Sequence, residues 1–152
     1  MSRRVFISQL LALPFAGLLN AGAQEVPQGT HKKLKIMMKS AWGSDDPTKA
    51  AFPFLHGLAL SEAGHDVQIF LLGEAVSLMR KSVATAVVPV GWPPLAGTLD
   101  KVVAQNIQIY ACGACSRARG VTEADLGQYK AKFGNPTIFV GLVEWADRVI
   151  TE

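Results

Sequence analysis

The chain has 152 residues, of which 49% are hydrophobic and 18% are charged, and its formal net charge at pH 7 is +3. This length and composition predict one domain with a substantial hydrophobic core. The sequence holds no internal repeat, no low-complexity segment and no stripe of lysine and arginine interleaved with aromatic residues, so nothing in it indicates binding to nucleic acid.

Residues 1–23 have the features of an export signal of the twin-arginine type. Arg3 and Arg4 precede an apolar stretch at residues 10–19, and small residues ending at Ala23 suit a cleavage site. The apolar stretch is too short to span a bilayer and is broken by Pro14, which argues against a stable membrane anchor. We therefore expect cleavage near Ala23 and a mature protein in an oxidising periplasm. Cleavage removes the two positive charges of Arg3 and Arg4, so the net charge of the whole chain says little about the partners of the mature protein.

After a flexible lead-in at residues 24–33, apolar runs of strand length alternate with segments of helical periodicity through a single domain at residues 34–152. We expect strands near residues 34–38, 67–72, 107–111, 129–133 and 148–151, helices near 48–62, 74–80, 95–105, 122–126 and 136–145, a helical turn after 111, and a loop at 82–94. Strands and helices that alternate with short connections predict a parallel sheet with helices on both faces.

The first helix has the clearest boundaries. Asp46 is a suitable N-cap, Pro47 fits the first helical position, and Gly64 suits a left-handed C-terminal cap. The loop before this helix begins at Ser40 and should emerge from the same edge of the sheet as the third strand. We therefore include Ser40 and Trp42 among the supporting residues of a site at that edge, with Trp42 as a hydrophobic wall.

The residues best suited to carry out chemistry are Cys112 and Cys115, the only two cysteines in the chain. They follow the apolar third strand and precede a helical turn, and carboxyl ends of parallel strands are where such sheets bind ligands. The free amide groups at a helix start stabilise a thiolate. Arg117 and Arg119 would add positive potential if they fold back, and the small Gly113 leaves the sulfurs accessible.

A thiolate at this place suits thiol exchange or persulfide transfer, and a structural disulfide is an equally open interpretation. A metal site needs more ligands than two cysteines. His31, His56 and His65 lie far from the cysteines in the sequence, so we expect neither a bound metal nor another cofactor.

Four segments carry a resemblance to a known family. They are the Asp-Pro helix start at residues 46–47, residues 63–76, the Cys-x-x-Cys-x-x-x-Arg-Gly segment at residues 112–121, and residues 146–151. In this order and spacing the chain resembles the DsrE/DsrF-like family, which includes the TusD-type sulfur-relay proteins and the YchN-like proteins. The resemblance extends over residues 34–152.

This resemblance implies a three-layer α/β/α, flavodoxin-like fold that assembles into trimers or hexamers. In the sulfur-relay members, a cysteine at the end of the third strand accepts a persulfide, and it lies seven residues before the arginine of an Arg-Gly pair. Cys112 and Arg119 match these positions here. Cys115 would be a second thiol able to resolve Cys112 as a disulfide.

The sequence therefore predicts an exported sulfur carrier or thiol-redox protein that acts through Cys112 with Cys115. Its partners would be a sulfur donor or acceptor protein, or a small thiol. Two alternatives stay open. One is a non-catalytic oligomeric binding module with a structural disulfide, and the other is binding of a soft ion such as Cu(I) between cysteines of neighbouring subunits.

Overall fold

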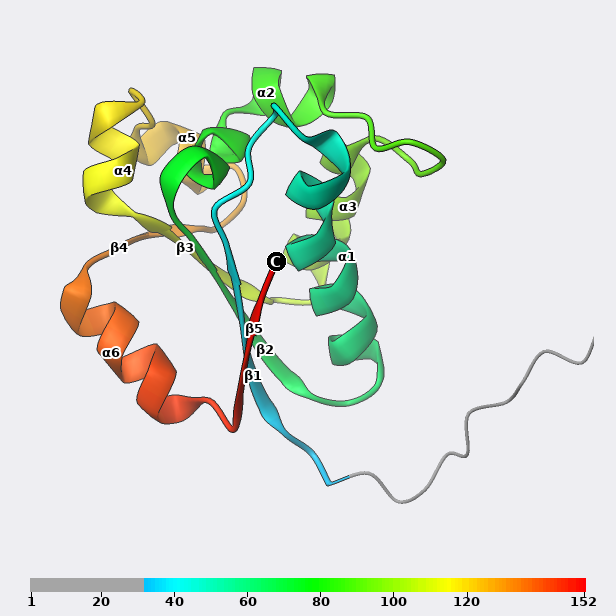
Figure 1. Cartoon of the computed structure of the whole chain (residues 1–152), viewed down its shortest axis with the longest axis vertical. Coiled ribbons are helices and arrows are strands. Elements are labelled where there is room, and N and C mark those ends of the chain that lie inside the picture. The colour runs from blue at the N-terminus through cyan, green and yellow to red at the C-terminus, as the bar shows by residue number, and fades with distance from the viewer. Residues whose placement is uncertain (1–31) are drawn as a thin grey trace, which may run out of the picture. The chain divides into compact units, whose positions relative to one another are not determined.

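A computed structural model describes residues 32–152, and the predicted export signal and most of the lead-in lie outside these residues. Five parallel strands form one sheet in the order β4-β3-β2-β1-β5 within this part of the chain (Figure 1). The strands are β1 (Lys35–Ser40), β2 (Asp66–Leu71), β3 (Gln108–Cys112), β4 (Lys132–Gly134) and β5 (Arg148–Thr151). The helices are α1 (Pro47–Glu62), the 3₁₀ helix η1 (Gly73–Met79), α2 (Lys81–Ala86), α3 (Leu95–Ala104), α4 (Gly113–Ala118), α5 (Glu123–Gly127) and α6 (Pro136–Trp145).

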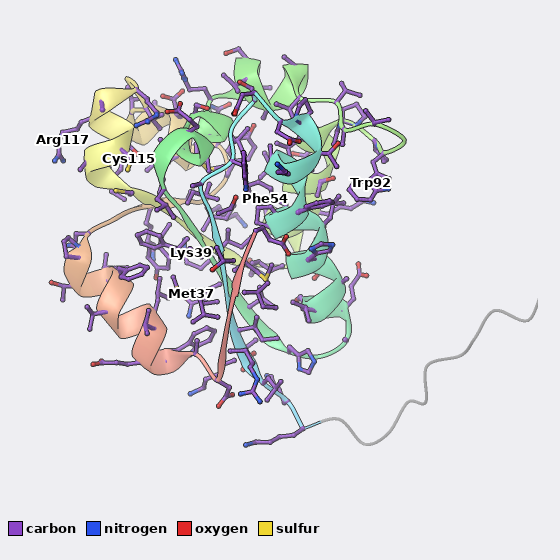
Figure 2. All side chains as sticks on the ribbon, in the orientation of Figure 1. Met37, Lys39, Phe54, Trp92, Cys115 and Arg117 are labelled. Atoms are coloured by element: carbon purple, nitrogen blue, oxygen red, sulfur yellow. The ribbon has the colours of Figure 1, made fainter. Side chains whose placement is uncertain are left out.

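The helices lie on both faces of the sheet, as Figure 1 shows, with α1 and α3 on one side and α6 on the other. Side chains alternate along β1, so Ile36 and Met38 join the core under α1 and α3, whereas Met37 packs in a second, smaller core under α6. Figure 2 labels Met37 and Lys39 on β1, and Phe54 on α1 in the larger core. The predicted α/β fold, with a parallel sheet between two helical layers in a single domain, is confirmed.

The sequence predicts the ends of α1 correctly. The Asp46 side chain accepts a hydrogen bond from the backbone N–H of Lys49 at 3.0 Å, and Pro47 is the first helical residue. After the helix, Gly64 has a φ of +93°, the left-handed conformation that glycine adopts without a steric penalty.

Two expectations differ from the structure. Residues 82–94 do not form one loop, because α2 occupies the first part of the segment and buries Ala84 in the main core. The prolines that indicated a loop lie only in its second part. The fourth strand is shorter than expected: β4 has three residues, which pair with the last three residues of β3.

The two faces of the sheet are covered unequally. The smaller core contains the buried residues Met37, Phe70 and Leu142, and α6 exposes Val140 and Val143 to solvent. Within residues 32–152, no helix is long and apolar enough to cross a membrane.

Gly43, in the loop between β1 and α1, lets this loop pack directly against η1. A Cβ atom at this position would lie 2.7 Å from the Cβ of Glu74 and 3.0 Å from the Glu74 carbonyl oxygen, neither of which moves without the backbone. We expect Gly43→Ala to lower the free energy of unfolding by about 1–3 kcal/mol in denaturant titrations.

Gly141→Ala is the matched control for Gly43→Ala. Gly141 lies inside α6 with open space around its Cβ direction, so alanine there should leave stability unchanged or raise it by about 0.4–1 kcal/mol. Equal effects of the two substitutions would contradict close packing at Gly43.

Candidate functional site

Both cysteines lie at the carboxyl end of β3. Cys112 is the last residue of the strand and pairs with Gly134 of β4, and α4 begins at the next residue. Cys115 follows in the first turn of α4 (Figure 2). Both sulfurs are free thiols on half-buried residues.

Cys112 is the more acidic of the two thiols. Burial by itself raises the pKa of Cys112, but several neighbours together outweigh it and lower the pKa below its ordinary value. These neighbours are the thiol of Cys115, the backbone N–H groups of Cys115 and Ala114, and the positive charge of Arg117. Cys112 is therefore the sulfur that more readily becomes a nucleophilic thiolate.

Cys115 has the opposite tendency. Burial, the adjacent Cys112 sulfur and its negative charge raise the pKa of Cys115, although a backbone hydrogen bond from Gly73 acts against this. The N–H of Gly73 donates to the Cys115 sulfur at 3.3 Å. Gly73 has a φ of +54°, so the strand-to-helix turn that directs this N–H at the sulfur favours glycine.

The two predicted arginines have different contacts. The Arg119 guanidinium forms a two-pronged ion pair with Glu74 of η1, with Nε donating to Glu74 Oε2 at 2.9 Å, and it also donates to the Cys115 carbonyl at 3.3 Å. Because these contacts join α4 to η1, they show Arg119 holding the turn after the cysteines, in addition to the positive potential expected from the sequence. Arg117 lines the cavity beside the cysteines.

An open cavity of about 520 Å³ lies beside the sulfurs, between the sheet end, α4 and the start of α6. Apolar side chains from β2 and α6 form much of its wall, and two cations also line it. Its lining residues are Lys39, Phe70, Leu72, Cys112, Gly113, Ala114, Cys115, Arg117, Gly134, Asn135, Pro136 and Phe139.

Not every predicted supporting residue reaches this cavity. Gly113 does, but Ser40 and Trp42 are not among the residues that line it. Ser40 is fully buried and accepts a hydrogen bond from the Trp42 N–H at 3.3 Å. The Trp42 ring lies under the ammonium group of Lys49, at 3.9 Å from the ring centre. Ser40 and Trp42 thus shape the neighbouring loop.

The described histidines lie away from the sulfurs. His56 contacts the carboxylate of Glu152 at 2.8 Å, and His65 accepts a hydrogen bond from the Leu34 N–H at 3.2 Å. Within residues 32–152, no group of three or more histidine, cysteine, aspartate or glutamate side chains is placed to hold a metal ion.

Sequence reasoning missed three parts of the site: Lys39, Gly73 and the first turn of α6. Lys39 directly follows the apolar residues 36–38 of β1, and a half-buried charge at the end of a strand covered on both faces can be a sign of a nearby cavity. Gly73 directly follows the second predicted strand, and the Gly-Asn-Pro sequence at residues 134–136 directly follows the fourth. Both glycines stand at carboxyl ends of strands, where a site was expected.

Comparison with known proteins identifies the family. The model of the DsrE/DsrF-like family matches residues 32–151, which is the whole described part of the chain except its last residue. The chain belongs to the DsrE/DsrF-like family. Among curated proteins, an uncharacterized protein of Methanopyrus kandleri, MK0008, is 27% identical over 99 residues, which cover 65% of this chain and 76% of that protein.

Solved structures with a similar fold have low sequence identity to the chain. The YchN protein of E. coli has a TM-score of 0.63 at 18% identity, and the alignment covers 80% of this chain and 100% of the YchN chain. MTH1491 from Methanobacterium thermoautotrophicum, a protein of unknown function, has a TM-score of 0.56 at 15% identity, with coverage of 79% and 100%. These likenesses support the fold.

The unequal pKa values predict which cysteine reacts first. Because the pKa of Cys112 is lowered and that of Cys115 is raised, initial alkylation by iodoacetamide should rise with pH at Cys112 first and at Cys115 only at higher pH. Peptide mass spectrometry of the reduced chain across a pH series measures both rates. Arg117→Gln should move the Cys112 midpoint upward, because it removes one of the groups that stabilise the thiolate. Faster alkylation of Cys115 at low pH would contradict the assignment.

Proposed function

We propose that this protein is a sulfur carrier in which Cys112 holds sulfur as a persulfide and Cys115 is the resolving thiol. The observation that carries the proposal is the position of Cys112 beside the cavity at the end of β3, where its neighbours lower its pKa, with a second thiol of raised pKa beside it. Membership of the DsrE/DsrF-like family supports a role in sulfur relay or thiol redox chemistry.

The chemistry needs no resident cofactor. The Cys112 thiolate attacks the outer sulfur of a donor persulfide, the donor's S–S bond breaks, and the donor leaves as a thiolate. Cys112 then carries one extra sulfur, with no net oxidation. In the hand-off, an acceptor thiolate attacks that outer sulfur and the Cys112 thiolate leaves. A lowered pKa makes Cys112 a good leaving group as well as an available nucleophile.

Cys115 offers a second outcome. If its thiolate attacks the inner sulfur, on Cys112, the persulfide bond breaks, hydrosulfide leaves and a Cys112–Cys115 disulfide forms. A dithiol reductant must then restore the two thiols. The same pair thus supports both sulfur carriage and thiol redox exchange, depending on which nucleophile arrives first.

We also propose that the chain acts outside the cytoplasm, on the strength of the paired Arg3 and Arg4 and the apolar segment that follows. N-terminal sequencing of the exported protein tests this, since it should begin just after Ala23.

We propose further that the chain forms a homo-oligomer. Val140, Val143 and Val149, which are 52%, 43% and 45% exposed, offer apolar surface on α6 and β5, and sedimentation of the full chain measures its state.

The test of the carrier role is sulfur loading of the reduced full chain. After treatment with polysulfide and trapping by an alkylating reagent, mass spectrometry should show one added sulfur on the peptide that contains Cys112. Cys115→Ser should retain the added sulfur, and for longer, because resolution to the disulfide is removed. Cys112→Ser should lose it.

The same variants separate the carrier from the binding module with a structural disulfide. A chain that takes up no sulfur at Cys112, and whose Cys112→Ser, Cys115→Ser variant differs only in stability, would rule out the carrier role. Circular dichroism of each variant shows whether the fold is intact.

A further inference from the structure

We propose that the cavity beside Cys112 binds a small organic persulfide or thiol that carries a negatively charged group on an apolar body. This inference rests on the proposed function, and it adds the chemical class of the molecule that exchanges sulfur with Cys112.

The charge preference follows from the cations of the cavity. Lys39 and Arg117 both line it, and no aspartate or glutamate is among its lining residues. Across residues 32–152, neither cation forms a salt bridge with another side chain. Lys39 is half-buried on the sheet face that it shares with Met37, where a charge without a counter-ion is unfavourable. An anionic group in the cavity would supply that counter-ion.

The apolar body follows from the walls and the size. Phe70 and Phe139 meet edge to face with ring centres 5.2 Å apart, and Leu72 and Pro136 extend the same apolar wall. The volume of about 520 Å³ lies within the range of roughly 300–1,000 Å³ typical of sites for small organic ligands. An inorganic sulfur anion would leave most of this apolar wall uncovered.

Placement of the two features suits sulfur transfer. Lys39 pairs with Phe70 in the register of β1 and β2, and Cys112 ends the next strand, β3. A ligand R–S–SH with its anionic group at Lys39 and Arg117 and its body against Phe139 can present its outer sulfur to Cys112. The Cys112 thiolate takes that sulfur, the ligand's S–S bond breaks, and R–S⁻ leaves with the electron pair. The reverse reaction passes sulfur from Cys112 to R–S⁻.

The test compares disulfide reagents on the full chain with Cys115→Ser, in which Cys112 forms one stable mixed disulfide. The first reagent is dithiobis-nitrobenzoate, an aromatic disulfide with a carboxylate on each ring, and the second is the neutral aromatic disulfide dithiodipyridine. In each case the thiolate attacks one sulfur and the other half leaves as a thiolate or thione. The ratio of the two rates cancels changes in the nucleophilicity of Cys112.

Adding Lys39→Gln should lower the rate ratio of anionic to neutral reagent by about three- to fivefold, which corresponds to loss of one partly exposed ion pair. Lys101→Gln, on the exposed side of α3, removes the same charge away from the cavity and should leave the ratio unchanged. An equal ratio in the parent and in Lys39→Gln would overturn the charge preference.

The apolar body is tested with tetrathionate, an inorganic anion from which Cys112 displaces thiosulfate. Phe139→Ala should slow reaction with dithiobis-nitrobenzoate by about three- to tenfold more than reaction with tetrathionate, because only the aromatic reagent contacts the ring. Phe139→Leu keeps the packing of α6 and should have a smaller effect. Equal slowing of both reagents would overturn the organic class and leave an inorganic anion as the substrate.

Failure of this inference is distinguishable from failure of the proposed function. Sulfur loading of Cys112 from polysulfide with no charge preference keeps the carrier role and overturns the selective cavity. A charge preference without any sulfur loading keeps the cavity and overturns the carrier role.

Discussion

The direct passage from β3 into α4 is the constraint on which the site depends. Because α4 begins at Gly113, immediately after the strand, Cys112 is at once the end of β3 and the N-cap of α4. Its sulfur therefore lies beside the N–H groups of Ala114 and Cys115, which lower its pKa. The passage is also tightly packed, since a Cβ atom on Gly113 would lie 3.3 Å from the Gly134 carbonyl oxygen of β4. A longer connection would separate the thiol from the amide groups that stabilise its charge.

Two sets of contacts build the site, and they meet at α4. The sulfurs are held from the η1 side, through the hydrogen bond from Gly73 to Cys115 and the ion pair between Arg119 and Glu74. The apolar walls of the cavity come mostly from β2 and α6, and the end of β3 and α4 form the side that carries the cysteines. The groups that lower the Cys112 pKa belong to α4, and one of them, Arg117, also lines the cavity. None of the groups that shift the pKa of Cys112 belongs to α6, so a substitution in the α6 part of the wall should leave the acidity of Cys112 largely unchanged.

The sequence predicts the fold well because its signals are local. Apolar runs, the Asp46 cap and Gly64 mark elements whose order implies a parallel sheet, and the strand end then places Cys112. The rest of the site depends on distant segments coming together. In the sequence, Arg117 and Arg119 both follow the cysteines and look alike. Only the position of Glu74 on η1 shows that Arg119 links the turn after the cysteines to η1 through an ion pair. Lys39 and Cys112 line the same cavity because only β2 separates β1 from β3 in the sheet. The spacing of residues in the sequence does not reveal this order of strands.

The unequal pKa values of the two thiols also imply an order of events in the proposed carrier reaction. Burial and the neighbouring Cys112 sulfur with its charge both raise the pKa of Cys115, so Cys115 loses its proton less readily than Cys112 does. When Cys112 bonds to an incoming sulfur, the negative charge leaves its own sulfur atom. Part of what raised the pKa of Cys115 is then removed, and its thiolate becomes easier to form. In the proposed carrier, Cys115 would thus become a better nucleophile once Cys112 is loaded, and hand-off to an acceptor would compete with resolution to the disulfide.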